Sequence, residues 1–480
     1  MSSTATIPHP VRPTVACSSW RITSKRTIFF LLILVVLLVS GWPLANLIKL
    51  GLRGADLSLF DVGLVKVLTN TLVIAILSTS FSIILGTVFG FLLSRTNIFG
   101  KNQIKSFLLY PYIIPSVILA IGWVILANPG VGLLKPFFPW INIYTISGIF
   151  FVEVLSWYTF VMLNVGNVLE NMDGSLEESA RMCGASPLRI FFTITLPLLR
   201  PALIGSSILV FLCSLSSFAV PAIIGGPGKI YVLTTKIYQW IKIGTTNSVL
   251  EAMMLSIPII VVAFVLGYAS EKWLNRHSFA TLTGKHNRKL EIRLGRWRWP
   301  LTVAFIAYYQ GKTRYRSRNL LVTLASLPYA APGTILAMAI LFNFTGYSPY
   351  FLLLFAYVAK YMNYGIRVVS PAISNVDKSL EEASLMCGAT WLQTIVKVWL
   401  PVLKGTFSTA IFLLIAPLFS ECTMSLMLSG PEAPTIGIRL FHLQEYESPP
   451  LASVLAVVIL VLVIGLNLTV KKLSRGKLGV

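Results

Sequence analysis

Three charged side chains within apolar stretches of the sequence are the first residues whose types could do chemistry. Glu153, Lys360 and Glu421 each lie in or beside a long run of apolar residues. A charged group at the centre of a bilayer is costly unless it is paired or hydrated, and such groups often mark a solute pathway. We therefore expect each of the three to have a polar partner. Glu421 is expected either to line a pathway or to serve packing.

The other reactive side chains form no catalytic or metal-binding pattern. The cysteines include no C-x-x-C pair, and the sequence has no Walker A motif for binding ATP. We predict no catalytic residue, no metal site and no cofactor. The histidines are expected in solvated loops or tails, and the cysteines are expected to act as small packing residues. The histidines are His9, His277, His286 and His442, and the cysteines are Cys17, Cys183, Cys213, Cys387 and Cys422.

The composition excludes a soluble enzyme. Of the 480 residues, 55% are hydrophobic and 12% are charged, against roughly 25% charged in a soluble domain. The mean hydropathy is +0.79. The fold class predicted is therefore all-α, a polytopic helical membrane protein that lies in a lipid bilayer. Basic loops on the cytoplasmic side of that bilayer explain the net charge of +22, so no nucleic acid partner is predicted.

About ten stretches are long and apolar enough to cross the hydrocarbon core, which takes about 20 helical residues. The stretch 299–310 is too short to cross, and basic residues flank it on both sides. It is therefore predicted to be a short interfacial helix. The ten predicted spans lie near residues 28–48, 66–93, 106–127, 143–168, 198–224, 250–270, 320–343, 349–369, 402–428 and 451–470.

The distribution of basic residues predicts the orientation of these spans. If the chain starts in the cytoplasm, 30 of the 39 Lys and Arg residues fall in cytoplasmic segments and eight fall outside. Basic residues concentrate in cytoplasmic loops, so both termini are expected in the cytoplasm. Residues 1–24, rich in Ser, Thr and Pro, are expected to be a flexible tail.

One loop sequence occurs twice. Residues 175–185 read SLEESARMCGA and residues 379–389 read SLEEASLMCGA, 204 residues further on. Both loops are predicted to face the cytoplasm, so the two halves should have the same orientation and be related by an axis along the membrane normal. Other short sequences that occur in both halves show that the halves differ by an insertion or deletion ahead of the loops. Leu-Pro at 196 and 400 and Gly-Pro at 226 and 430 keep the offset of 204, and Pro-Tyr-x-x-Pro at 111 and 328 has an offset of 217.

The repeated loops should contain two short helices at an angle. Ser175 with Glu178, and Ser379 with Glu382, match the S-x-x-E capping box that starts a helix. Gly184 and Gly388 permit a left-handed turn or a close backbone approach. Ser186 and Pro187 suit the start of a second helix. Pro197 and Pro401 are expected to begin the next spans.

The offset also suggests a partner for one charged residue. It places Lys360 opposite residue 156, one helical turn from Glu153. We predict a Glu153–Lys360 ion pair across the pseudo-two-fold axis. The alternative is that each residue bonds separately, with Asn164, Asn167 and Asn363 as polar contacts between helices.

The loops resemble the EAA loop of type I ABC importer permeases. Two copies in one chain imply a fused double permease. The resemblance implies that both loops couple the chain to two copies of an ABC ATP-binding subunit, and that a periplasmic or lipoprotein solute-binding protein delivers the solute. The chain would then be a transporter subunit in a bacterial plasma (inner) membrane, and not an enzyme. The implied coupling residues are Glu178, Ala180, Gly184, Leu196 and Pro197, and Glu382, Ala383, Gly388, Leu400 and Pro401.

Within that family, several stretches resemble permeases for ferric iron. They include residues 110–115, 127–134, 221–227 and 232–238. Fused permeases for thiamine and for phosphonates are similar, so these substrates are alternatives. Members of that family generally have an extra pair of spans at the start of the second half, and the resemblance implies that two spans are missing here. Either other helices close the gap, or the chain is a degenerate permease that transports poorly. A gradient-driven secondary transporter is a separate alternative.

The predicted domains follow from the spans and loops. They are a cytoplasmic tail at 1–24, a first permease half at 25–270 with its EAA-like loop at 170–197, a basic cytoplasmic linker at 271–319 that contains the interfacial helix 299–310, and a second, truncated half at 320–480 with its loop at 374–401.

Overall fold

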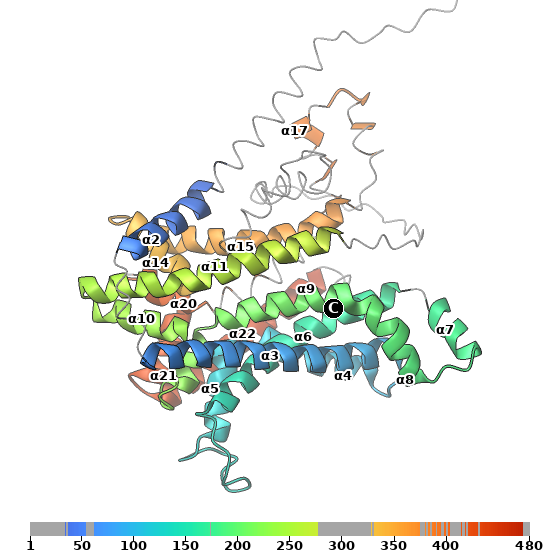
Figure 1. Ribbon diagram of the computed structural model, residues 1–480, viewed down its shortest axis with the longest axis horizontal. Helices are drawn as coiled ribbons and strands as arrows, with labels where there is room; N and C mark the ends of the chain where they lie inside the picture. Colours follow the sequence, from blue (N-terminus) through green and yellow to red (C-terminus); the bar gives the residue numbers. More distant parts are fainter. Residues whose placement is uncertain are drawn as a thin grey trace, which may run out of the picture.

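A computed structural model describes most of the chain. The described residues are 37–53, 62–172, 174–276, 331–374, 421–430 and 433–473, with single residues and short pieces elsewhere, among them 383–384, 386–389 and 391–394. All regular elements within this part are helices (Figure 1). The tail 1–24 and the predicted interfacial helix 299–310 lie outside the described residues.

The helices before the basic linker form the larger part of the bundle. They are α2 (Trp42–Arg53), α3 (Val62–Arg95), α4 (Lys101–Ile113), α5 (Ser116–Ala127), α6 (Ile146–Asn171), α7 (Ser175–Met182), α8 (Pro187–Ile190), α9 (Leu196–Leu215), α10 (Leu233–Ile243) and α11 (Thr246–Arg276), with the π-helical turns η1 (Leu37–Gly41), η3 (Phe191–Thr195) and η4 (Pro221–Gly225).

The described helices after the linker repeat part of this order. They are α14 (Gly333–Asn343), α15 (Pro349–Ser374), α17 (Trp391–Thr394), α20 (Thr423–Leu428), α21 (Ile436–Glu445) and α22 (Pro449–Leu473).

Five described helices are long and apolar enough to cross a membrane, or six if one bent pair crosses as a single span. Four of the five match the spans predicted near 66–93, 143–168, 250–270 and 451–470. The fifth runs over Pro187–Leu215, so the prediction of a span at 198–224 is wrong at both ends. The α11 helix continues to Arg276, beyond the predicted start of the linker.

The span predicted near 106–127 is not one straight helix. It is a bent pair, α4 and α5, whose axes differ by 100°. Ile114 is extended, with ψ at 126°, and Pro115 follows it. Proline disfavours helical geometry in the residue before it and has no N–H to donate, so the helix stops there. The sequence shows this proline, but hydropathy alone cannot place the bend.

Two glycines set the packing of the longest helix. A Cβ atom at Gly86 would lie 2.5 Å from the Cβ of Val161, and one at Gly90 would lie 2.8 Å from a Val165 methyl group. The α3 and α6 backbones therefore approach more closely than any side chain on α3 would permit. Small residues four apart are a common way of packing helices in membranes.

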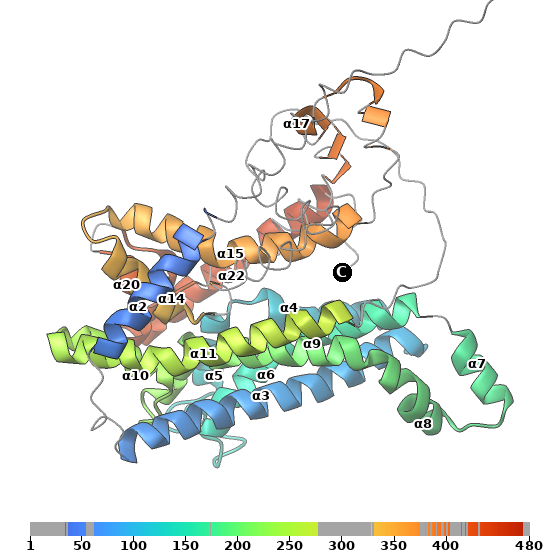
Figure 2. The same cartoon turned by 45° about the horizontal axis from the view of Figure 1, so that its top comes forward.

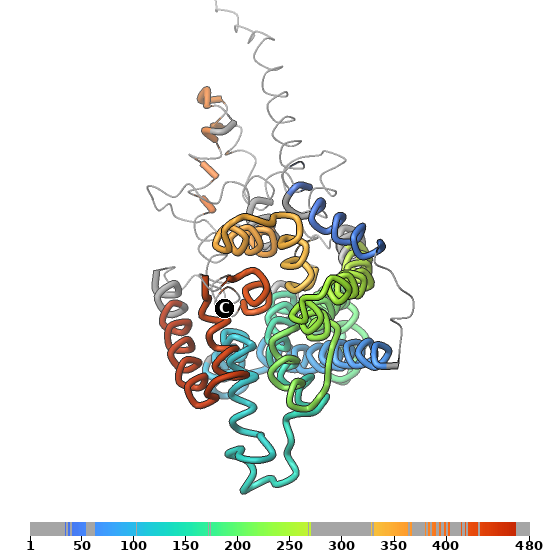
Figure 3. Tube along the Cα trace, turned by 90° about the vertical axis from the view of Figure 1, so that its left-hand side faces the viewer, coloured from blue at the N-terminus to red at the C-terminus, as the bar shows by residue number. Residues whose placement is uncertain are grey.

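The same order of helices occurs on both sides of the linker. The α5 and α14 helices begin 217 residues apart, and α11 and α22 begin 203 residues apart. The change in offset lies in one loop, since residues 128–145 join α5 to α6 but only residues 344–348 join α14 to α15. The longer loop projects from the bundle (Figures 1 and 3).

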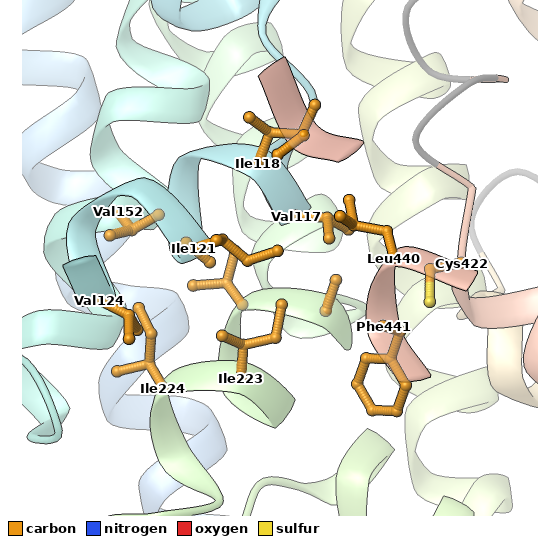
Figure 4. Packing of buried hydrophobic residues seen from close by; sticks show 14 of the residues in the cluster. Val117, Ile118, Ile121, Val124, Val152, Ile223, Ile224, Cys422, Leu440 and Phe441 are labelled. Atoms are coloured by element: carbon orange, nitrogen blue, oxygen red, sulfur yellow. The ribbon is translucent and has the colours of Figure 1, made fainter. Parts of the chain in front are cut away.

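The two sets of helices pack reciprocally. The α5 helix contacts α21 and α22, and its counterpart α14 contacts α10 and α11. A two-fold relation produces this exchange of equivalent contacts. Figure 4 shows the buried residues between the two sets, which come from α5, η4, α21 and the residues around Cys422.

One hydrogen bond lies near the pseudo-axis. Lys242 Nζ donates to the hydroxyl of Tyr446 over 2.8 Å, and the two residues are 204 positions apart. Two positions that are equivalent in a repeat can touch only close to its axis. Viewed from the end at which α10 and α21 lie, the orange and red helices occupy one side of the bundle and the blue-to-green helices most of the other (Figure 3).

The α2 helix crosses between the two sets. It packs against α11 and α14, and Asn46 Nδ2 donates to Asn343 Oδ1 over 2.8 Å. In Figure 3 it lies beside the orange and yellow-green helices, away from α3. The N-terminal helix therefore helps to hold the two sets together.

Candidate functional site

The first repeated loop leaves the bundle directly after a long helix. The α6 helix ends at Asn171, and α7 begins at Ser175. Figures 1 and 2 show α7 and α8 at the end of the bundle opposite α10. No residue of α7 is buried, so the loop offers its side chains to solvent or to a partner.

Glu177 ties this exposed loop to the bundle. Its carboxylate lies 3.3 Å from Arg95 Nε at the end of α3 and accepts a hydrogen bond of 2.7 Å from Thr195 Oγ1. Arg95 also donates to the carbonyl oxygen of Met172 over 3.4 Å. Glu177 is not among the predicted site residues. Its signal was only that Glu177 falls within the repeated sequence beside Glu178.

The prediction that Ser175 caps this helix is wrong. The cap is Gly174, which has no side chain to cap with, and the N–H of Glu178 donates to its carbonyl oxygen over 3.0 Å. Gly174 has right-handed helical angles, φ −69° and ψ −15°, so the helix starts one residue early and Ser175 is its first residue. The second predicted box, Ser379 with Glu382, lies outside the described residues.

Both loops end their first helix with the same backbone turn. Gly184 and Gly388 have φ values of +81° and +78°, which confirms the predicted left-handed turn. The N–H of Ala185 donates to the carbonyl of Ala180, and that of Ala389 donates to the carbonyl of Ser384. This is the six-to-one bond of the Schellman motif. A Cβ atom at either glycine would meet no atom within 4 Å, so the φ angle alone requires glycine.

The same side chains project from both loops. Met182 is 90% exposed and Met386 is 88% exposed, and Leu176 and Leu380 are exposed as well. The prediction that the cysteines are packing residues is wrong for Cys183 and Cys387, which are exposed beside these methionines. The repeat contains all three pairs, so the signal was present in the sequence. Its periodicity could not show whether they faced the bundle or away from it.

The second short helix of the first loop is not separate from the next span. Ser186 caps it, since its hydroxyl accepts from the N–H of Arg189 over 3.4 Å, and Pro187 is its first residue. The chain then continues without a break through α8, η3 and α9. Leu196 and Pro197 therefore stand inside a helix, and Pro197 does not begin a span. Its missing N–H and its ring interrupt the regular bonding of the turn before it, which is π-helical.

Less of the second loop is described. Ala383 is exposed, and its carbonyl accepts from the N–H of Cys387 over 3.0 Å. Glu382, Leu400 and Pro401 lie outside the described residues.

Lys360 pairs within its own half of the chain. Its Nζ lies 3.7 Å from Glu421 Oε2, so the predicted Glu153–Lys360 pair is wrong. Tyr361 donates to the same carboxylate over 2.6 Å, and the N–H of Met424 donates to its other oxygen over 3.0 Å. Glu421 lies directly before Cys422, the N-cap of α20, and its carboxylate meets Lys360 and Tyr361 of α15, which the repeat offset could not show.

Glu153 has neutral partners. It is 2% exposed, accepts from Trp157 Nε1 over 3.1 Å and accepts from the hydroxyl of Ser217. These contacts agree with the alternative in which each charged residue bonds separately. Asn164 Nδ2 donates to Ser206 Oγ on α9 over 3.1 Å, which is a polar contact between helices as that alternative predicts.

Among the described residues, no three His, Cys, Asp or Glu side chains come together as metal ligands do. His442 lies in α21 rather than in a loop, next to the Tyr446 ring. The other histidines lie outside the described residues.

The described helices form the bundle of a polytopic membrane protein, and the sequence assigns its family. The chain belongs to the family described as binding-protein-dependent transport system inner membrane component, which it matches over residues 82–276 and 301–475. This confirms the predictions of an ABC importer permease and of a transporter subunit rather than an enzyme.

Two of the relatives that the chain resembles in sequence are named as ferric-iron permeases. The chain is 24% identical over 434 residues to the ferric transport system permease protein FbpB of Actinobacillus pleuropneumoniae, which covers 72% of this chain and 62% of the relative. It is 23% identical over 490 residues to the Fe(3+)-transport system permease protein FbpB 2 of Haemophilus influenzae, which covers 87% of this chain and 93% of the relative. It thus spans less than two thirds of the first relative's length.

A solved structure also matches. It is the bacterial ABC transporter involved in the import of the acidic polysaccharide alginate, with a TM-score of 0.46 and 18% identity, over 54% of this chain and 99% of that chain.

Proposed function

We propose that this chain forms the pathway of an importer and that its two repeated loops receive the motion of separate ATP-binding subunits. The observation that carries the proposal is the pairing of the loops. Each has a glycine in a left-handed turn and an exposed methionine immediately before its Cys-Gly pair. An exposed apolar side chain on a polar loop suits insertion into a pocket of a partner protein.

The proposed assembly has one ATP-binding subunit at each loop. The coupling residues are Glu178, Ala180 and Gly184, with Leu196 and Pro197, and in the second loop Glu382, Ala383, Gly388, Leu400 and Pro401. Glu177 holds the first loop at its fixed place on the bundle. A periplasmic or lipoprotein solute-binding protein delivers the solute from the other side of the membrane.

The proposed topology places the loops and both termini in the cytoplasm. The halves are residues 25–270 and 320–480, joined by the basic linker 271–319. The excess of basic residues in the segments on the loop side supports this orientation. Maleimide labelling of Cys183 and Cys387 in sealed vesicles of known sidedness tests it.

The proposed solute is ferric iron. The names of the two relatives support it, together with the resemblance at residues 110–115 and 221–227. Thiamine and phosphonates are the alternatives within the same family. Uptake of radioactive ferric iron by cells expressing the chain with its binding protein and ATP-binding subunits separates them, with thiamine and a phosphonate as competitors.

A pair of substitutions tests the loops. In Met182→Asp with Met386→Asp, a charge replaces the apolar side chain at the centre of each contact. Co-purification of the ATP-binding subunits and iron uptake should both fall by about tenfold or more, as the loss of an interface anchor produces. The matched control is Val131→Asp, which places the same charge at an exposed position in the α5–α6 loop. Full retention of the subunits by the Met182/Met386 variant would contradict the proposal.

A further inference from the structure

Each half of the chain has a carboxylate-centred hydrogen-bond cluster at the same place in the repeat, with the carboxylate on a different element in each half. In the first half, Glu153 on α6 is the carboxylate and Ser217 supplies the hydroxyl. In the second half, Glu421, which is 204 residues after Ser217, is the carboxylate. Tyr357, 204 residues after Glu153, supplies a hydroxyl that bonds Ser425 over 2.6 Å.

A third position of each cluster is also equivalent. Trp157 on α6 donates its indole N–H to Glu153, and Tyr361 on α15, 204 residues later, donates its hydroxyl to Glu421. Lys360 adds its charge to the second cluster. The carboxylate thus lies on the long helix α6 in the first half. In the second half it is that of Glu421, whose segment meets the long helix α15; Ser217 has the equivalent position in the segment that meets α6. We call the segments that end at Ser217 and at Glu421 the facing segments. In both halves a buried polar contact joins the same two elements.

Those two elements have a particular place in the fold. Three residues separate the end of the long helix, α6, from the start of the coupling helix α7. The facing segment continues into Phe218 in one half and Cys422 in the other, and both lie in the buried cluster between the halves. Figure 4 shows Cys422 beside Leu440 and Phe441, close to the α5 residues of the first half. The polar contact is therefore one link between the helix that carries the loop and the centre of the bundle, beside the apolar contacts that Ile149 and Val152 of α6 make there.

We infer that these clusters are clasps that transmit motion of the coupling loops to the centre of the bundle. Glu153 and Glu421 are the positioning residues of the first and second clasp. If α6 moved without its facing segment, the Glu153 carboxylate would lose the hydroxyl of Ser217 in an apolar site, which is unfavourable. The two elements therefore move as one body. The inference rests on the proposed function, because it needs the loops to be driven.

Cys422 provides a native probe of the centre. It is 1% exposed, so alkylation requires the buried cluster to open. The other cysteines are replaced by Ser, and the rate at which N-ethylmaleimide labels Cys422 is measured in the complex with the ATP-binding subunits, with and without ATP and vanadate. Substitutions are made in the first half only, so they do not touch the second clasp.

The chain offers a rescue and a control. Glu153→Met removes the carboxylate with little change of volume. Glu153→Tyr combined with Ser217→Glu moves the carboxylate to the side on which it lies in the second half. Asn164→Leu, the matched control, removes a polar contact between α6 and α9 that does not lead to the centre. Thermal unfolding shows that each variant is folded.

ATP with vanadate should raise Cys422 labelling by about tenfold in the parent and in Asn164→Leu, as expected of a two-state shift. The rise should be lost in Glu153→Met, although the ATP-binding subunits stay bound, and should return in the exchanged double variant. An undiminished rise in Glu153→Met would overturn the clasp and leave the proposed function standing. A loss that the exchanged variant does not reverse would also overturn it. No rise in the parent would contradict the proposed function itself.

Discussion

The Lys360–Glu421 pair gives a prediction about stability whose size follows from the structure. Both side chains are largely buried, at 17% and 7% exposed. Removing one partner of a buried pair costs about 3–5 kcal/mol because a charge is left unpaired. Glu421 keeps two neutral donors, Tyr361 and the N–H of Met424. We therefore expect Lys360→Met to destabilise the protein by about 2 kcal/mol, below that range.

A double-mutant cycle isolates the pair. Glu421→Gln alone should also destabilise, and the double variant should be more stable than the two single effects predict, by about 1–2 kcal/mol. Thermal unfolding of the purified chain in detergent gives each value, with the other cysteines replaced by Ser so that a thiol-reactive dye reports exposure of buried Cys422. The matched cycle of Lys360→Met with Glu153→Gln should be additive. Additivity of Lys360 with Glu421, or coupling of Lys360 with Glu153, would refute the assignment of partners.

Three further predictions test separate features. Gly184→Val should cost about 1–2 kcal/mol more than Gly184→Asn, because Asn tolerates the left-handed turn; equal melting temperatures would exclude that turn. Gly86→Leu should prevent α3 from packing on α6 and lower the yield of folded protein sharply, whereas Gly122→Leu on α5, where a Cβ atom meets nothing within 4 Å, should not. Burial raises the pKa of Glu445, so its folded state favours the protonated form. The contribution of the protonated Glu445 to stability is therefore fully present below the ordinary pKa of a glutamate and is lost as the pH rises through the raised pKa of the folded state. In Glu445→Gln, which has no titrating group at this position, the melting temperature should fall less steeply as the pH rises above the ordinary pKa of glutamate. An equal fall of melting temperature with pH in the parent and in Glu445→Gln would contradict the prediction.

The sequence predicted four of the five long described helices to within a few residues, because apolar length is a local signal. Gly184 and Gly388 were identified from their place in the repeat, and their φ angles confirm the left-handed turn. Ser186 and Pro187 begin a helix as expected. The family was predicted from the same loops, since the spacing of their residues does not depend on tertiary contacts.

The contacts between side chains of neighbouring segments could not be predicted in the same way. Hydropathy shows that Lys360 lies in a span, but not which neighbouring segment turns toward it, and a repeat offset gives equivalence rather than contact. Glu421 reaches Lys360 from its place directly before Cys422, the N-cap of α20, and Glu177 reaches Arg95 because α3 ends beside the loop. The continuity of α8 with α9 escaped prediction because Pro197 was read as the start of a span, and a π-helical turn accommodates it instead.

The central claim is that both repeated loops are held by an ATP-driven partner, and native cysteines can test it directly. Cys183 and Cys387 are exposed on the two loops, so a short bismaleimide can join each to a neighbouring subunit that has an engineered surface cysteine. In membranes that contain the full assembly, a chain with only Cys183 or only Cys387 should form one adduct with an ATP-binding subunit. A chain with both should form two. Failure of either loop to form an adduct, or labelling of either loop only from the outer side of sealed vesicles, would contradict the account.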